Sequence, residues 1–317
     1  MEPVVAFAAE TLGDYWTSCD NRWSIELGRH RYKRLIFNEA AIGSGLDEGY
    51  YQFENDHGSE RLEGLLVYIQ KTAKFATPLK ESIKADFVCR RGLLRNFSIN
   101  YDSAGTIVFY AVRQKGVIFL CEEKQFVESS DKLRRSLYYA LKFKQLMTVP
   151  LSRNATATKS SETKRVFRAS LTKEGEEPIR VYYAAEIDCV DGRDLPCELK
   201  LISKPLETAW DRNRTMAWYM HCFLANVKSI LVAERHRTLL RQIQPITPEM
   251  IYKHAVSPWS HFNCIEQMYN VLFSVKNQMT KDGQTLKFTL TKGVASSEAS
   301  DFGDYIVPEH FLRHFPF

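Results

Sequence analysis

Three carboxylates and one lysine occur at a regular two-residue spacing in the segment AAEIDCVDGRDLPCELKLISK. Glu186 and Asp188 form the first pair, and Glu198 and Lys200 form the second. Residues two apart on a β-strand point to the same face, so each pair shares a face if its segment is a strand. A turn through residues 190–193 lets two such strands pair as neighbours, and the four side chains can then converge.

Carboxylates that are brought together repel one another, and each raises the pKa of the others. A hard divalent cation removes this conflict, because Mg²⁺ and Mn²⁺ are held by a few carboxylates together with substrate phosphate and water. A lysine beside the ion can orient a water molecule or neutralise a phosphate as charge builds on it. This is the arrangement of PD-(D/E)xK nucleases, which cleave phosphodiester or pyrophosphate bonds with metal-activated water. A solvent-facing polar stripe on a β-hairpin would explain the same spacing.

The surrounding sequence alternates between strand and helix patterns. Two β-branched runs flank a Gln-Lys-Gly turn in residues 106–123 and predict a hairpin. Apolar residues at helical spacing predict a helix over 131–148, with Asp131 placed to cap its start. Further strands are expected for RVYYAAEIDCV, PCELKLI, KSILVAER and TLKFTLTKG, and further helices for TAWDRNRTMAWYMHCFLANV and HFNCIEQMYNVLFSVKNQM. The mixture predicts an α+β fold with α/β-like features, in which helices flank a mixed central β-sheet.

The length of 317 residues suits one large domain or two ordinary ones. The most linker-like segment is SRNATATKSSETK, residues 152–164. Because no Pro/Gly spacer accompanies it, we interpret it as a surface loop. We therefore expect a single domain over residues 1–317.

Composition excludes several classes of protein. Hydrophobic residues make up 44% of the chain and charged residues 26%, and the net charge of +5 permits a polyanionic partner without demanding one. Seven cysteines, none of them at CxxC spacing, argue against a disulfide framework and a structural zinc site. The N-terminus lacks the positive n-region of a signal peptide, and no window reaches the ~18 apolar residues that span a bilayer. We expect no membrane association and a nuclear or cytoplasmic location.

The motifs EIDC and CELK resemble the signature of the DXO family of decapping exoribonucleases, in which a Glu-x-Asp-Cys strand precedes a Glu-Leu-Lys strand. Four other stretches resemble family segments in the same order: SERLEGLLVYI, ADFVCRRGLL, YALKFKQLM and AWYMHCFL. The resemblance covers most of the chain from about residue 14 onward. It implies a single decapping-nuclease-like domain with a deep acidic pocket.

The resemblance also implies roles for the residues at the two motifs. Glu186, Asp188 and Glu198 would be metal ligands for Mg²⁺ or Mn²⁺, with the carbonyl of Leu199 completing the site. Lys200 would face the scissile phosphate or its water.

Three residues elsewhere match substrate-binding positions of the family. Arg91 would contact the RNA backbone or terminal phosphate, since a guanidinium can bind phosphate oxygens in pairs. Glu60 matches a residue near the bound nucleotide, and Arg22 matches, across a gap, an N-terminal arginine of similar role. Without the resemblance, Arg91 is an ordinary surface arginine and Glu60 a favourable acid at a helix start.

Two positions depart from the family pattern. Ala140 and Lys144 stand where the family's helix carries Gly and Glu, so an ammonium replaces a carboxylate. A cation within ~5 Å of Mg²⁺ would oppose metal binding. His221 replaces a Gln in the later helix and can still donate to a phosphate. We expect Lys144 to face the pocket, where it would weaken metal binding, limit the site to one ion or contact phosphate.

The expected substrates are RNA 5′ ends that are aberrantly capped, NAD-capped or triphosphorylated. The expected activities are decapping, pyrophosphate release and 5′→3′ exonuclease action in RNA quality control. A catalytically degenerate member would instead bind RNA ends or a partner 5′→3′ exoribonuclease, and would protect or channel transcripts. A DNA-directed nuclease also stays open, because phosphate-and-metal chemistry is indifferent to the sugar.

Overall fold

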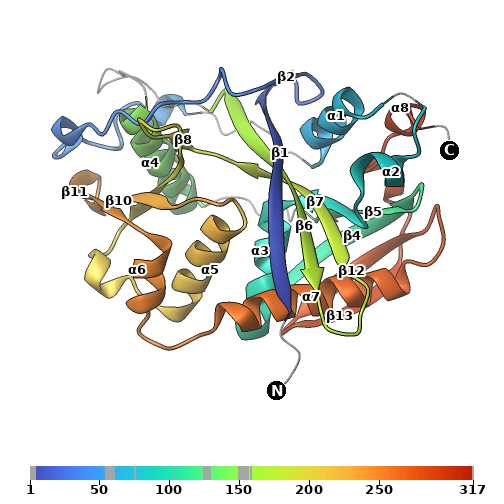
Figure 1. Ribbon diagram of the computed structural model, residues 1–317. Coiled ribbons are helices and arrows are strands. Elements are labelled where there is room, and N and C mark those ends of the chain that lie inside the picture. Colours follow the sequence, from blue (N-terminus) through green and yellow to red (C-terminus); the bar gives the residue numbers. More distant parts are fainter. Residues whose placement is uncertain are drawn as a thin grey trace.

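The computed structural model describes residues 5–53, 61–74, 76–103, 105–123, 130–148, 157 and 159–315. Within these residues, two β-sheets are flanked by helices (Figure 1). None of the described helices is long and apolar enough to cross a membrane.

The larger sheet has nine strands in the order β13-β12-β4-β5-β3-β7-β6-β1-β2. Strand β3 pairs in parallel with both β5 and β7, and the other neighbours are antiparallel. The sheet is therefore mixed, as predicted. Its strands are β1 (Ala6–Ser18), β2 (Ile25–Leu27), β3 (Phe87–Arg90), β4 (Thr106–Gln114), β5 (Val117–Glu122), β6 (Ser161–Thr172), β7 (Ile179–Glu186), β12 (Thr285–Thr291) and β13 (Val294–Ala299).

The smaller sheet has four strands in the order β11-β10-β9-β8. These are β8 (Cys189–Val190), β9 (Pro196–Ile202), β10 (Ser229–His236) and β11 (Leu239–Ile246). Residues 33–35 run along the other side of β8. The N–H of Val190 donates to the carbonyl of Lys33 at 2.9 Å, and the N–H of Leu35 donates to the carbonyl of Val190 at 2.8 Å.

The helices bury three apolar cores against the sheets. Side chains of α3, α5 and α7 share one core with the larger sheet, and those of α1, α2 and α8 share a second. Helix α4 packs on the smaller sheet in the third core. The helices are α1 (Glu63–Thr72), α2 (Leu79–Ile83), α3 (Arg91–Ile99), α4 (Asp131–Thr148), α5 (Arg212–Phe223), α6 (Pro248–Lys253), α7 (His261–Gln278) and α8 (Glu309–Leu312), with 3-10 helices at Glu39–Ala41, Tyr50–Gln52, Asn100–Asp102, Leu206–Thr208 and Gly303–Tyr305.

The hairpin predicted over residues 106–123 is β4 and β5, and the helix predicted over 131–148 is α4. The predicted cap of α4 is wrong. The Asp131 carboxylate accepts hydrogen bonds from Tyr50 and Arg135, while the Ser130 hydroxyl accepts the N–H of Leu133 at the helix start.

The strand predicted over residues 180–190 is interrupted. Strand β7 ends at Glu186, and the smaller sheet begins at β8, which pairs with β9. The first acidic motif therefore spans both sheets: Glu186 ends β7, whereas Cys189 lies in β8, and the predicted hairpin is present only as β8 and β9. Ile187 still donates to the Thr163 carbonyl of β6 at 3.0 Å, and the chain then crosses between the sheets.

The loop predicted over residues 152–164 is wrong at its C-terminal end. Residues 161–164 belong to β6 and pair with β1, with Glu162 opposite Thr17 and Lys164 opposite Tyr15. Residues 152–156 and 158 lie outside the described part of the chain.

Candidate active site

The acidic residues lie where the chain passes from the larger sheet to the smaller one. Glu186 is the last residue of β7, Asp188 directly precedes β8, and Glu198 lies in β9. The N–H of Leu199 donates to Asp188 Oδ2 at 2.9 Å, which fixes Asp188 against β9. Burial, followed by the neighbouring Glu198, raises the pKa of Asp188 despite the opposing effect of nearby lysines. The structure thus brings the three predicted acids together, although from two sheets.

Lys144 of α4 forms an ion pair with Asp188 Oδ1, and the prediction that it faces the acidic site is confirmed. Burial favours the neutral form of Lys144, but Asp188, Glu186 and Glu198 together raise its pKa above the usual value. An ammonium group therefore lies under the influence of all three acids.

A second group of charges links Glu186 to β6. Lys159 Nζ lies 3.1 Å from Glu186 Oε1 and 2.6 Å from Glu162 Oε1, and Lys164 Nζ lies 2.7 Å from Glu162 Oε2. Burial and the neighbouring Glu162 would raise the pKa of Glu186. The lysines, Lys159 first, outweigh both effects, and the pKa of Glu186 is lowered.

Sequence reasoning missed Lys159 and Glu162, because both fall in the segment interpreted as a loop. The alternation Ser-Glu-Thr-Lys at residues 161–164 could have revealed Glu162, since it places Glu162 and Lys164 on one face of a strand, but it does not include Lys159.

On the other side of the acids, Glu198 is only 3% exposed and faces cations. Lys200 Nζ donates to Glu198 Oε1 at 2.7 Å, and His221 Nε2 of α5 lies 3.0 Å from the same oxygen. Burial would raise the pKa of Glu198, but Lys200, His221 and Arg91 together outweigh it and hold that pKa well below its usual value. Burial, with Arg91 nearby, lowers the pKa of His221 to about 3, so its imidazole is neutral at pH 7.

Arg91 directly follows Arg90, the last residue of β3, and is the first residue of α3. Its side chain is buried, and its Nε and Nη1 have no hydrogen-bond partner among the described residues. Buried donors are nearly always paired, because an unpaired one costs free energy. The Arg91 guanidinium is close enough to Glu198 to lower its pKa. These unpaired donors beside the acids indicate a position for an anion.

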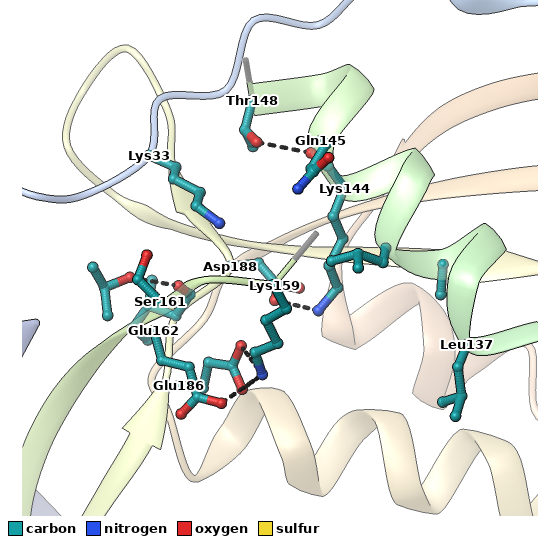
Figure 2. Close-up of a pocket in the computed structure, with 14 residues that line it drawn as sticks. Lys33, Leu137, Lys144, Gln145, Thr148, Lys159, Ser161, Glu162, Glu186 and Asp188 are labelled. Carbon is teal, nitrogen blue, oxygen red and sulfur yellow. Dashed lines mark hydrogen bonds and ion pairs between the residues drawn. The ribbon is translucent and has the colours of Figure 1, made fainter. Parts of the chain in front are cut away.

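A pocket of about 230 Å³ opens between α4, the start of β6 and the end of β7 (Figure 2). Its lining contains as many carboxylates as ammonium groups, so it is close to neutral. The charged lining residues are Lys33, Lys144, Lys159, Glu162, Glu186 and Asp188. Sequence reasoning missed Lys33, since only the tertiary path of residues 33–35 along β8 brings it there.

Two other residues predicted to bind substrate are not found in the described lining of this pocket. Arg22 lies in the turn before β2, beside Cys19, whose thiol is close enough to Glu162 and Lys159 to be affected by their charges. In the part of the chain that is described, Arg22 does not line the pocket. Glu60 lies outside the described residues.

The donor set suits a hard divalent cation, because carboxylates and a backbone carbonyl supply only oxygen ligands. Within the described ranges, however, no three Asp, Glu, His or Cys side chains are arranged to hold a metal ion. An incoming ion would have to take the place of ammonium groups that now face the acids. The pairs are Glu186 with Lys159, Asp188 with Lys144, and Glu198 with Lys200.

Comparisons with known sequences match the chain over nearly its whole length. A family model described as RAI1-like PD-(D/E)XK nuclease matches residues 10–311. The decapping nuclease dom-3 of Caenorhabditis elegans is 26% identical, over 97% of this chain and 84% of its own.

Solved structures share the fold. Candida albicans Rai1 in complex with pU5 and Mn²⁺ has a TM-score of 0.73 at 17% identity, covering 98% of this chain and 96% of its own. S. pombe Rai1 in complex with 3′-FADP also has a TM-score of 0.73 at 17% identity, covering 94% of this chain and 95% of its own. The predicted architecture, a mixed sheet flanked by helices, is confirmed.

Proposed function

The chain belongs to the family of RAI1-like PD-(D/E)XK nucleases, and from this we propose that it is a metal-dependent hydrolase of RNA 5′ ends. One observation carries the proposal: Glu186, Asp188 and Glu198 meet at the junction of the two sheets, and the Nε and Nη1 donors of the nearby Arg91 have no partner among the described residues. The decapping activity named for the C. elegans relative, and the pU5 and Mn²⁺ bound by the C. albicans protein, support the same reaction class.

We assign the metal-ligand role to Glu186, Asp188, Glu198 and the carbonyl of Leu199, with Mg²⁺ or Mn²⁺ as the cofactor. When bound, such an ion would act as a Lewis acid and would lower the pKa of a water molecule, so that the resulting hydroxide can attack phosphate. Lys200, which Glu198 holds by a 2.7 Å hydrogen bond, is assigned to the scissile phosphate, where its charge would stabilise the developing anion.

Arg91 and His221 are assigned to the RNA phosphate. The unpaired Nε and Nη1 donors of Arg91 can bind a phosphate anion, which would satisfy groups that the folded chain leaves without a partner. The neutral imidazole of His221 has a single N–H, which Nε2 directs at Glu198, so His221 can donate to the same anion only when that contact is released. Arg22 and Glu60 keep the substrate-binding roles that the family resemblance implies.

The test uses purified protein with 5′-triphosphorylated, NAD-capped and unmethylated-capped RNA in Mg²⁺ or Mn²⁺. We expect metal-dependent product release from at least one of these RNAs, and loss of that release in Asp188→Asn. The exposed Asp301→Asn is the matched control and should keep full activity. No release from any of the three RNAs by folded protein would overturn the proposal. Equal cleavage of a DNA of matched sequence would widen the proposed substrate class from RNA to nucleic acids in general.

The ion pair between Lys144 and Asp188 favours a second candidate, in which the chain binds RNA 5′ ends or a partner 5′→3′ exoribonuclease without cleaving RNA. The ammonium group weakens the attraction of the acids for a cation. In this case the protein would bind 5′-phosphorylated RNA and show no measurable Mn²⁺ affinity. Its affinity for that RNA would be the same in Asp188→Ala. Titration of Mn²⁺ into both proteins separates the two candidates.

A further inference from the structure

The pocket beside the acids contains one ammonium group that neutralises none of them. Lys33 lines the pocket, and its side chain has no ion-pair partner among the residues that the structure describes. Figure 2 shows the amino groups of Lys33 and Lys144 directed into the pocket from different elements. The two residues come from the segment along β8 and from α4, so only the fold brings them together.

The backbone around Lys33 is held on both sides. Its carbonyl accepts the N–H of Val190, and the hydroxyl of the preceding Tyr32 donates to Asp14 Oδ1 of β1 at 2.6 Å. Asp14 is itself buried and also accepts from Arg165 Nε at 2.8 Å. Lys33 therefore projects over the pocket from a fixed support, which lowers the entropy cost of using it to bind a ligand.

The charge of the pocket depends on what the acids bind. With three ammonium groups and three carboxylates in its lining, it has little attraction for an anion. A divalent cation bound by Glu186 and Asp188 would leave the lining with a net positive charge. Lys159 would keep Glu162 as a partner, whereas Lys144 hydrogen-bonds through its amino group to Asp188 in the described structure and would be released.

We propose that Lys33 and Lys144 form a subsite for a phosphate group of the RNA 5′ end, and that this subsite becomes available when a divalent cation replaces Lys144 at Asp188. The inference rests on the proposed function, since it takes Asp188 as a metal ligand. Each ligand removes an obstacle to the other: the cation frees Lys144, and phosphate holds Lys144 away from Asp188. Because such coupling is reciprocal, phosphate and the cation bind cooperatively.

The test is calorimetric titration of Mn²⁺ into the protein with and without inorganic phosphate, at equal ionic strength. Phosphate is expected to tighten Mn²⁺ binding about fivefold or more, the lower end of measured couplings between sites. Free phosphate in solution would sequester some Mn²⁺ and weaken the apparent binding, so a tightening cannot arise from that source.

Three substitutions assign the effect to residues. Lys33→Met should remove most of the phosphate effect, and without phosphate it should change Mn²⁺ affinity less than Lys144→Met does, because Lys144 and not Lys33 is paired with Asp188. Lys144→Met should tighten Mn²⁺ binding without phosphate, because the competing ammonium is gone, and should also reduce the phosphate effect. Lys281→Met, at an exposed position beside β12, is the matched control and should behave as the unsubstituted protein.

The outcomes separate this inference from the proposed function. Mn²⁺ binding that is lost in Asp188→Asn but indifferent to phosphate would overturn the subsite and leave the metal site standing. An undiminished phosphate effect in Lys33→Met would also overturn the subsite. Absence of Mn²⁺ binding under both conditions would remove the proposed function together with the subsite.

Discussion

At the residue scale, two cations approach the same acids in different ways. The Lys144 ammonium is paired with Asp188, while two nitrogens of the Arg91 guanidinium are buried without partners in the described chain. Removing Lys144 should therefore change how the acids attract other cations. Removing Arg91 should mainly change how the protein attracts an anion.

Arg91→Gln should weaken the binding of 5′-phosphorylated RNA about 10-fold or more, since a hydrogen bond to a charged group contributes about 1.5–3 kcal/mol. Thermal stability should change little, because the loss of the favourable charge interaction with Glu198 is offset by the removal of two buried donors that have no hydrogen-bond partner among the described residues. Fluorescence anisotropy and thermal unfolding measure the two effects. Arg180→Gln, at an exposed position near the start of β7, is the control. A lower melting temperature with unchanged RNA affinity would show that Arg91 has a structural role only.

Lys144→Glu should tighten Mn²⁺ binding about tenfold or more, because an opposing charge becomes an attracting one within a few ångströms of the acids. Without metal the variant should be less stable than the unsubstituted protein, since it adds a carboxylate to a cluster of carboxylates. Added Mn²⁺ should restore that stability. Calorimetry and thermal unfolding, with and without Mn²⁺, provide the measurement, and unchanged affinity would contradict the electrostatic role given to Lys144.

At the element scale, the chemistry of the site followed from sequence more readily than its geometry. The two-residue spacing of Glu186 and Asp188 predicts that both side chains share one face of a strand. The alternation of polar and apolar residues is not interrupted between them, at Ile187, so the sequence does not reveal that β7 ends at Glu186. The crossing is fixed by contacts distant in sequence: Ile187 with Thr163, and Asp188 with the N–H of Leu199. Local periodicity did predict β4, β5, α4 and β9, because these elements are regular and bury apolar residues.

The buried ion cluster at Asp14 should join β1 to β6 in a pH-dependent way. Burial would raise the pKa of Asp14, but hydrogen bonds from Tyr32, Arg165 and Arg29 lower it below its usual value. The stabilisation is therefore complete above about pH 4, the ordinary pKa of Asp, and is lost as the pH falls through the lowered pKa of the folded state.

Asp14→Asn should reduce the free energy of unfolding at pH 7 by about 3–5 kcal/mol, as for other broken buried ion pairs. The difference from the unsubstituted protein should shrink at pH 3 and below. Urea denaturation at the two pH values gives the comparison, with Asp301→Asn as the exposed control. An equal difference at both pH values would show that Asp14 stabilises the fold through packing rather than charge.

At the scale of the whole molecule, the proposed metal ligands come from both sheets, so a bound ion would connect them. Mn²⁺ at ~100 times its Kd should raise the free energy of unfolding by about 2.7 kcal/mol, the value that mass action gives for a ligand of the folded state. Thermal unfolding measures the effect, and Asp188→Asn should abolish it. An equal increase in Asp188→Asn would place the stabilising ion elsewhere.

The passage of the chain from one sheet to the other also bears on ion selectivity. Glu186 ends a strand of the larger sheet and Glu198 lies within the smaller one, so the angle between the sheets sets the separation of their carboxylates. Mg²⁺ requires oxygens at about 2.0–2.1 Å, whereas Ca²⁺ takes them at about 2.3–2.6 Å. Altered packing at the buried Ile187, between the two sheets, would then change which ionic radius fits without replacing any coordinating group.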